Sequence, residues 1–298
     1  MKKLDLKAYA KINLSLDVLG VRPDGYHEIA TVMQNIDLCD ELCVKWLPGE
    51  GSGIAIEIGT NKRFLPNDEK NLAYKAAKLV IDRFDVIKKT GPGKVLIDIK
   101  KRIPVGAGLG GGSADAAAVL YALTEMWGIE RHASLLCRLG AELGADVPFF
   151  VMGHFGLRCA LAEGTGTELK KLSGIECHAV LSKPPMHIST ADVYRGYDEI
   201  EDRDFARPDT QALITALKAK DHAAAGKNMI NVLENYTLKK YKTVEHTKLM
   251  IEETSPIQAF MSGSGPTVVG LYYDKESAEA AYGKLSGINK ETFLTKTL

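Results

Sequence analysis

Five glycines fall within the seven positions from Gly106 to Gly112, inside the segment R-I-P-V-G-A-G-L-G-G-G-S-A-D-A-A-A at 102–118. Glycine permits positive φ and lets backbone N–H groups come close to a ligand. An alanine-rich segment follows at once, and its apolar spacing predicts a helix from about Ser113 to Trp127. The unpaired amides and the dipole of a helix's first turn favour an anion, above all phosphate. The junction of loop and helix is therefore predicted to bind phosphate.

Three kinds of phosphate-binding loop compete for this segment. Gly106, Gly108 and Gly111 spell the G-x-G-x-x-G pattern of dinucleotide folds, but a spacer at 101–104 separates strand from glycines. A Walker loop needs Gly-Lys-Ser/Thr, and no lysine follows these glycines. A long glycine loop that opens with Pro104 and closes with a serine on a helix fits the segment. A glycine turn that serves only packing is the plain structural alternative.

Hydrophobic periodicity along the chain predicts an α+β fold. Residues 4–18 alternate as a strand does, with Lys11 and Asn13 on the polar face. The R-P-D-G turn at 22–25 leads to extended segments over 29–46. Further strands are expected at 94–99, at 178–183 and on both sides of a turn within 259–273, and helices at 71–84, 132–143, within 209–253 and at 275–286. We expect two domains, residues 1–160 and 161–298, the second a small α+β sandwich.

Charge and cysteine content argue against several classes of function. Lys and Arg together number 38, as do Asp and Glu, whereas binders of nucleic acid or anionic membranes usually carry a basic excess. Five scattered cysteines without C-x-x-C favour reduced thiols in the cytoplasm. The N-terminus lacks the apolar core of a signal peptide, and no apolar run approaches the ~20 residues of a membrane helix. We expect a cytoplasmic protein whose partner is a small molecule, not nucleic acid or membrane.

Four motifs follow one another in an order typical of a known kinase group. They are A-Y-A-K-I-N-L-S-L at 8–16, P-V-G-A-G-L-G-G-G-S at 104–113, G-A-D-V-P-F-F at 144–150 and M-S-G-S-G-P-T at 261–267. In this order they resemble the motifs of the GHMP kinase superfamily. The resemblance implies an ATP-dependent small-molecule kinase. It also implies a two-domain α+β fold, with an N-terminal α/β domain like domain 2 of ribosomal protein S5 and a C-terminal ferredoxin-like α+β sandwich.

The resemblance assigns two catalytic residues. Asp146 matches the aspartate that takes the proton of the acceptor hydroxyl, or at least orients that hydroxyl. Lys11 matches the lysine that pairs with this aspartate. A cation within about 4–6 Å would keep the carboxylate ionised and help to neutralise developing charge. Without the resemblance, Asp146 is an ordinary turn former and Lys11 an ordinary solvated lysine.

The nucleotide site follows from the same resemblance. It implies ATP with Mg²⁺, and the hydroxyl of Ser113 as a magnesium ligand, although a serine at a helix start is also a common N-cap. The ATP-binding residues that it implies are Asn71, Leu72, Lys101, Pro104, Val105, Gly106, Ala107, Gly108, Leu109, Gly110, Gly111, Gly112, Ser113 and Ala114.

Three further motifs narrow the resemblance to one branch of the superfamily. They are R-P-D-G-Y-H at 22–27, K-N-L-A at 70–73 and H-I-S-T-A-D-V-Y at 187–194. In this branch the acceptor is a cytidine diphosphate derivative of methylerythritol, phosphorylated at its 2-hydroxyl in the non-mevalonate route to isoprenoid precursors. Aromatic rings stack on a pyrimidine and an imidazole bonds its edge. The substrate-binding residues implied are Asn13, Tyr26, His27, Thr190, Tyr194, Gly263, Ser264 and Gly265.

Two alternatives and two departures accompany this interpretation. The alternatives are another GHMP kinase, of homoserine or mevalonate type, and a nucleotide-binding regulator without catalysis. P-D-G-Y-H argues against the first, and the presence of both Lys11 and Asp146 argues against the second. The glycine loop ends in Ser-Ala-Asp where the family commonly has Ser-Ser-Asn, so that Asp115 adds a negative charge near the phosphates. The segment 153–164 is also longer than is usual for the family.

Overall fold

The computed structural model describes residues 1–130 and 132–298, and the chain divides into two compact units. Unit 1 comprises Met1–Ala10, Leu38–Ile103 and Gly110–Leu157, and unit 2 comprises Lys11–Asp37, Pro104–Leu109 and Arg158–Leu298. The long strands β1 (Lys2–Val21) and β2 (His27–Pro48) pair with each other. One part of each strand belongs to unit 1 and the other part to unit 2. The glycine loop is shared in the same way. The two predicted domains, 1–160 and 161–298, stay a prediction.

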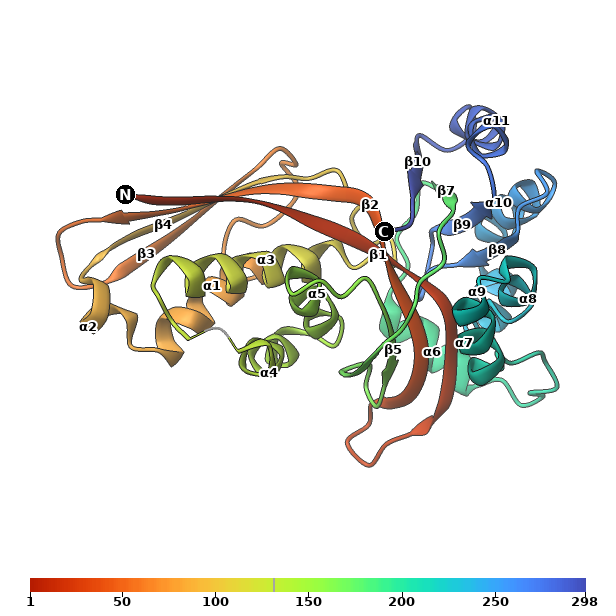
Figure 1. The fold of residues 1–298 in the computed structure, drawn as a ribbon, viewed down its shortest axis with the longest axis horizontal. Helices are drawn as coiled ribbons and strands as arrows, with labels where there is room; N and C mark the ends of the chain where they lie inside the picture. The colour runs from red at the N-terminus through yellow and green to blue at the C-terminus, as the bar shows by residue number, and fades with distance from the viewer. Residues whose placement is uncertain (131) are drawn as a thin grey trace. The chain divides into compact units, whose positions relative to one another are not determined.

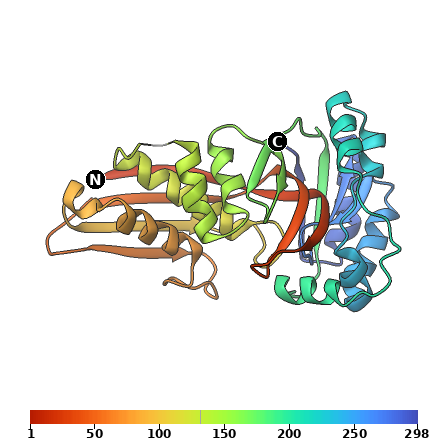
Figure 2. The ribbon, with the colours of Figure 1, turned by 90° about the horizontal axis from the view of Figure 1, so that it is seen from below.

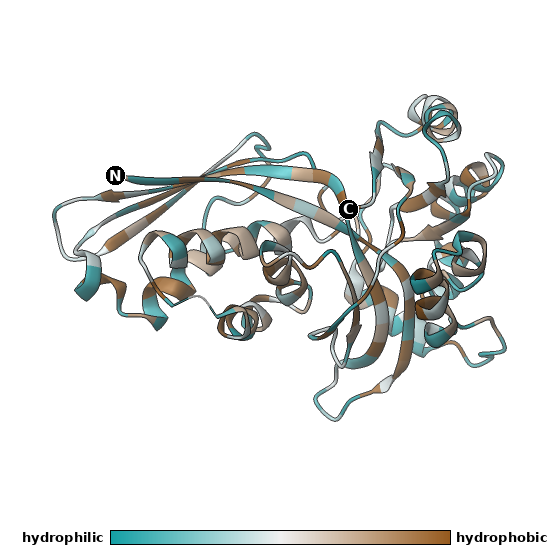
Figure 3. Ribbon diagram, viewed as in Figure 1, coloured by the Kyte–Doolittle hydropathy of each residue, from teal (hydrophilic) through white to brown (hydrophobic). Residues whose placement is uncertain are grey.

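Unit 1 is a sheet with helices on one face (Figures 1 and 2). The second half of β2 pairs antiparallel with β4 (Gly93–Lys100), which pairs parallel with β3 (Ile54–Thr60). The first half of β1 alternates as predicted, with Leu4, Leu6 and Ala8 less exposed than the residues between them. Figure 3 shows the same alternation as brown and teal bands along the strands of this unit. The helices of unit 1 are α1 (Leu72–Arg83), α2 (Val86–Thr90), α3 (Gly111–Met126), α4 (Ala133–Leu143) and α5 (Val147–His154).

Helices α1 and α3 pack against each other through small side chains. Asn71 caps α1, since its Oδ1 accepts a hydrogen bond of 3.0 Å from the Ala73 N–H. In α3 the residues from Ala114 to Leu120 are all buried, which alanine makes sterically feasible on every face. The packing of α1 against α3 therefore holds the start of α3 in place, where the phosphate-binding turn is predicted.

Unit 2 contains the remainder of the six-stranded sheet to which β3 and β4 belong, and a second sheet of four strands. The first half of β2 pairs with β5 (Cys159–Glu163), and β5 pairs with β6 (Glu168–Lys171). The other sheet is antiparallel, in the order β10-β7-β9-β8. Its strands are β7 (His178–Lys183), β8 (Gln258–Met261), β9 (Val268–Tyr272) and β10 (Glu291–Lys296). This strand order, with helices between β7 and β8 and between β9 and β10, is that of the predicted ferredoxin-like sandwich.

The helices of unit 2 cover this antiparallel sheet and continue its core. They are α6 (Thr190–Asp198), α7 (Thr210–Ala219), α8 (His222–Lys227), α9 (Glu234–Lys240), α10 (Lys242–Glu252) and α11 (Lys275–Ser286). Helices α10 and α11 contact β7 and β9. A buried cluster that includes Val180, Val193, Tyr197, Met261 and Val268 joins strands and helices. Among the helices of the described residues, none is both long and apolar enough to cross a membrane.

Most predicted elements are present, with three differences. The helix predicted from Ser113 begins at Gly111 instead, because Gly110 in the left-handed conformation starts it. The helical region 209–253 is four helices, interrupted at 228–233 where Asn231 bridges to Leu16. The polar face of the first strand is not exposed beyond Ala10, since the segment 10–18 is buried on both faces. Strands β3, β5, β6 and β10 and helices α2, α5 and α6 were not predicted.

Candidate active site

The first part of the glycine loop, Pro104–Leu109, lies against the segment 262–265 within unit 2. Gly106 and Gly108 have φ of 61° and 74°, in the region that glycine adopts without strain. A methyl group on Gly108 would lie 2.1 Å from the carbonyl oxygen of Ser262. The Ser262 hydroxyl donates to the Gly108 carbonyl at 3.0 Å. Glycine is thus required here by the close approach of two main chains.

The second part of the loop forms the start of α3 in unit 1. Gly110 has φ of 70° at the N-cap and, as a glycine, has no side chain with which to cap this end. Gly112 is exposed and Ser113 half-buried. The first amides of α3 therefore lack intrahelical partners, and a bound anion is one way to satisfy them. Ser113 is the third residue of the helix and not its N-cap, which corrects the capping alternative.

Lys101 lies beneath this first turn, buried between two carboxylates of unit 1. Its ammonium donates to Asp115 at 2.7 Å and also to Asp40, and the three side chains are no more than 6% exposed. Burial, the largest cause, raises the pKa of the Asp115 carboxyl to about 7, although the Lys101 charge pulls it down. Burial alone would lower the pKa of Lys101, but the two carboxylates outweigh it and the pKa is raised. Asp115 therefore faces Lys101 in the interior of unit 1.

Asn71 and Leu72 stand beside the same turn. A methyl group on Gly112 would contact Leu72 Cδ1 at 3.5 Å. The side chain of Asn71 is engaged in its own cap and donates to the Pro66 carbonyl at 2.8 Å. The structure thus brings Asn71, Leu72, Lys101 and the start of α3 together within unit 1.

Lys11 and Asn13 head a buried polar chain in unit 2. Lys11 Nζ donates to Asn13 Oδ1 at 2.6 Å, and Asn13 Nδ2 donates to Thr31 Oγ1 at 2.8 Å. The Thr31 hydroxyl in turn donates to the Ser15 carbonyl at 2.6 Å. Lys11 is 4% exposed and Asn13 2%. The plain alternative of a solvated Lys11 is therefore wrong, because the side chain is buried.

The glycine loop is attached to this polar chain through the backbone. The Lys11 N–H donates to the Leu109 carbonyl at 3.1 Å. A methyl group on Gly263 would lie 3.3 Å from the Gly108 carbonyl oxygen and 3.5 Å from Asn13 Oδ1. Within unit 2, Lys11, Asn13, Gly108, Leu109 and Gly263 thus form one cluster of side chains and bare backbone.

The segment 261–265 is held by a residue far along the chain. Asn231 Nδ2 donates to the carbonyls of Met261 and Gly263, each at 2.7 Å. The hydroxyls of Thr190 and Ser264 are 2.9 Å apart, so two predicted substrate residues are neighbours. Asn231 was not found from the sequence, since nothing local in N-V-L-E-N distinguishes it from a helical asparagine. Ser262 lies in a recognised motif and could have been found.

His27 and Tyr194 come together in unit 2, one turn along α6 from Thr190. Their ring centroids are 4.6 Å apart and the ring planes are inclined by 36°. His27 Nε2 lies 3.0 Å from both carboxylate oxygens of Asp198, which makes Nε2 the proton-bearing nitrogen. Tyr26 is 68% exposed. Asp198 was missed because its role depends on a contact with a residue 171 positions away.

Asp146 begins α5 in unit 1. It occupies the N-cap position, its side chain is half-buried, and Pro148 follows in the first turn. The positive end of a helix favours a carboxylate at this position. Asp146 therefore belongs to a helix start and not to a simple turn.

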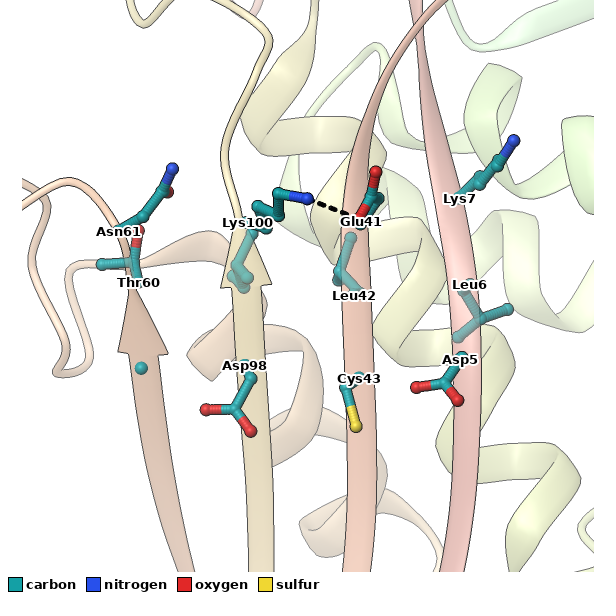
Figure 4. A pocket seen from close by; sticks show the side chains of 12 residues that line it. Asp5, Leu6, Lys7, Glu41, Leu42, Cys43, Thr60, Asn61, Asp98 and Lys100 are labelled. Carbon is teal, nitrogen blue, oxygen red and sulfur yellow. Dashed lines mark hydrogen bonds and ion pairs between the residues drawn. The ribbon is translucent and has the colours of Figure 1, made fainter.

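A separate groove of about 740 Å³ lies over the strands of unit 1 (Figure 4). Glu41 accepts from Lys100 at 3.1 Å, and Lys45 lies 3.5 Å from Asp98 on the same strands. The groove residues are Asp5, Leu6, Lys7, Glu41, Leu42, Cys43, Gly59, Thr60, Asn61, Asp98, Ile99 and Lys100. None of them is a predicted site residue, and ion pairs join Glu41 to Lys100, Asp98 to Lys45 and Asp5 to Lys3. We interpret this surface as a solvated sheet face.

Comparisons with known proteins agree with the motifs. A family model of the N-terminal domain of GHMP kinases matches residues 71–154, and one of the GHMP kinase C-terminal region matches residues 213–289. A 4-diphosphocytidyl-2-C-methyl-D-erythritol kinase of Geobacillus thermodenitrificans (strain NG80-2) is 42% identical over 99% of this chain and 97% of its own. One of Clostridium botulinum (strain Alaska E43 / Type E3) is 42% identical over 99% of this chain and all of its own.

Solved structures give the same result. A crystal structure of 4-(cytidine 5'-diphospho)-2C-methyl-D-erythritol kinase matches with a TM-score of 0.80 and 32% identity over 99% of both chains. Homoserine kinase from Cytophaga hutchinsonii ATCC 33406 matches with a TM-score of 0.73 at 18% identity over 100% of this chain and 95% of its own, and so shares the fold. The fold and the kinase activity expected from the motifs are confirmed. The chain belongs to the family of 4-diphosphocytidyl-2-C-methyl-D-erythritol kinases, ATP-dependent small-molecule kinases of the GHMP type.

Proposed function

We propose that this chain transfers the γ-phosphoryl group of ATP to the 2-hydroxyl of 4-diphosphocytidyl-2-C-methyl-D-erythritol, a step of the non-mevalonate route to isoprenoid precursors. The names of its relatives support this acceptor. The observation that carries the proposal is the buried Lys11–Asn13 pair, whose backbone is bonded to the glycine loop at Leu109. A buried ammonium next to bare backbone amides suits phosphoryl transfer, which needs positioning and charge stabilisation above all.

The loop and the first turn of α3 bind the phosphates in this proposal. Backbone amides from Gly106 to Ser113 donate to phosphate oxygens, and positive φ at Gly106, Gly108 and Gly110 lets them converge; the Ala114 N–H donates to the Gly110 carbonyl. Asn71 and Leu72 border the adenine, and Lys101 supports the turn from below.

Asp146 and Lys11 carry the chemical step in this proposal. The acceptor 2-hydroxyl gives its proton to the Asp146 carboxylate as its oxygen forms the bond to the γ-phosphorus. The bond from that phosphorus to the oxygen bridging to the β-phosphate breaks, and ADP leaves with that electron pair. Lys11 stabilises the charge that develops on the transferred group, and Asn13 bonds the acceptor.

Magnesium fits the donor set at the start of α3. The described residues contain no group of three or more His, Cys, Asp or Glu side chains that could hold a metal. Mg²⁺ keeps several waters and is usually bound by one or two carboxylates together with substrate phosphates, so it needs few ligands from the protein. The half-buried hydroxyl of Ser113 would hold it from the protein side. When bound, the ion neutralises charge on the phosphates.

The cytidine end of the acceptor binds near His27 and Tyr194. Tyr194 and the exposed Tyr26 offer ring faces to the base, and His27 Nδ1 remains for a hydrogen bond to its edge, since Nε2 faces Asp198. Thr190 and Ser264, with Gly263 and Gly265, bind the remainder of the acceptor in this proposal.

The test is ADP release with and without the cytidine compound, for the wild type and Asp146→Asn. We expect turnover of the wild type to require the acceptor. In Asp146→Asn we expect kcat to fall at least ~10²-fold, the scale of general-base catalysis, with ATP affinity unchanged. Glu142→Gln, an exposed change on the preceding helix, is the matched control and should turn over normally. Near-normal turnover of Asp146→Asn would remove Asp146 from the mechanism. ATP binding without acceptor-dependent turnover would indicate a regulator.

A further inference from the structure

Three charged side chains of unit 1 meet in the interior directly below the start of α3. Lys101 Nζ donates to Asp115 at 2.7 Å and to Asp40, and the exposed fractions of the side chains of Lys101, Asp40 and Asp115 are 4%, 0% and 6%. A buried charge is costly unless it is paired and hydrogen-bonded. A buried ion pair often contributes little net stability. The presence of this cluster is therefore better explained by its position below the start of α3.

The three residues come from the two sides of the glycine loop and from a neighbouring strand. Lys101 follows β4 and precedes the loop, Asp115 is in the second turn of α3 after the loop, and Asp40 is in β2. Asp40 Oδ1 also accepts from the backbone N–H groups of Arg102 and Ile103, at 2.6 and 2.9 Å. The last residues before the loop are thereby fixed to β2.

The first turn of α3 rests on this cluster. A methyl group on Gly111 would lie 2.9 Å from Ile103 Cγ2 and 3.3 Å from Lys101 Nζ. The backbone of Lys101 is held as well, since its N–H donates to Asn61 Oδ1 at 2.8 Å. One ammonium thus ties the chain before the loop to the helix after it.

We propose that Asp40, Lys101 and Asp115 are positioning residues that hold the two ends of the glycine loop at the spacing required to bind the phosphates of ATP. This rests on the proposed phosphate-binding role of the loop. The six residues Pro104–Leu109 between the tied ends contain two glycines and gain little rigidity of their own. Because the phosphates are bound both before and during transfer, loss of the tie affects affinity for ATP more than the rate of transfer.

The experiment measures binding of the non-hydrolysable analogue AMP-PNP with Mg²⁺ by calorimetry, and kcat at saturating ATP. For Asp115→Leu we expect the dissociation constant to rise at least about 10-fold, with kcat within about threefold of the wild type. Asp115→Asn keeps an oxygen that accepts from Lys101, and should stay within about threefold of wild-type affinity. Asp82→Asn breaks an exposed ion pair with Lys78 on α1, and is the control that should change neither value.

A second variant keeps the test decisive if Asp115→Leu does not fold. Asp40→Asn combined with Lys101→Met and Asp115→Leu removes all three charges together, which buried ion pairs and triads often tolerate. It should fold and still bind the analogue at least about 10-fold more weakly, because nothing ties the loop ends. Wild-type affinity in either folded variant, or an equal loss in Asp115→Asn and Asp115→Leu, would overturn the proposal. The calorimetry contains no acceptor, so failed turnover with the cytidine compound contradicts the proposed function and not this inference.

Discussion

Burial decides what the polar residues of this chain do. Lys11 and Asn13 alternate with apolar residues in a pattern that normally marks a solvent face. In the structure both are covered, and Lys11 bonds to Asn13 at 2.6 Å. The alternation predicts which residues share a face of the strand, but it does not show which other part of the chain packs against that face. A polar face that is buried in this way is a stronger indication of a site than the same residues in an exposed strand.

Asp198 provides a prediction at this scale. Its carboxylate accepts from His27 Nε2 and so leaves Nδ1 for the base. Asp198→Asn replaces a charge-assisted hydrogen bond by a neutral one at a partly exposed place. We therefore expect KM for the cytidine compound to rise about threefold with kcat unchanged. Steady-state kinetics at varied acceptor concentration measure this.

The matched control is Glu199→Gln, one residue further on and exposed, which should leave KM unchanged. A fall in kcat without a change in KM in Asp198→Asn would contradict the positioning role. If Glu199→Gln also changed both kcat and KM, the effect would come from the end of α6 and not from the contact with His27.

At the scale of elements, the approach of two loops depends on one glycine. Gly108 has φ of 74°, and an added Cβ would meet the Ser262 carbonyl oxygen at 2.1 Å. For Gly108→Ala we expect unfolding free energy to fall by about 1–3 kcal/mol, the usual cost of a left-handed non-glycine residue, with a further loss from the clash. ATP affinity should fall with it, since the loop must move away from Ser262.

Thermal unfolding and calorimetry of Gly108→Ala against Gly20→Ala check this. An added Cβ on Gly20 meets nothing within 4 Å, so that variant should behave as the wild type. Equal stability and equal ATP affinity of the two variants would show that the contact between Gly108 and Ser262 is not needed.

Elements with a strong period were predicted correctly, and short or locally ambiguous ones were not. The alternation of 4–18 and the spacing of 71–84 predicted β1 and α1 nearly to their ends. Helix α5 was missed because V-P-F-F-V-M is apolar throughout and has no helical period. The interruption at 228–233 was missed because it depends on contacts that are distant in sequence. Asn231 forms a bridge with Leu16 and donates hydrogen bonds to carbonyls of the segment 261–263. A local sequence pattern does not reveal hydrogen-bond partners that lie so far away in the sequence.

At the scale of the whole molecule, the order of motifs predicted the fold and the family, and both are confirmed. The polar network around the candidate site was largely outside the reach of the sequence. Asp40, Asn231 and Asp198 each act through a contact made by tertiary structure, with Lys101, Gly263 and His27 respectively. Asp115 was noticed as a departure near the phosphates, and the structure buries it against Lys101 instead.

The position of the transferred phosphate tests the central claim most directly. The protein is incubated with ATP and, in parallel, with the cytidine compound, homoserine or mevalonate, and each product is examined by phosphorus NMR. We predict one ADP for each phosphorylated acceptor, with the cytidine compound alone modified and the phosphate on its 2-hydroxyl. Phosphate on homoserine, on mevalonate or on another hydroxyl, or ATP consumed without any transfer, would contradict the account.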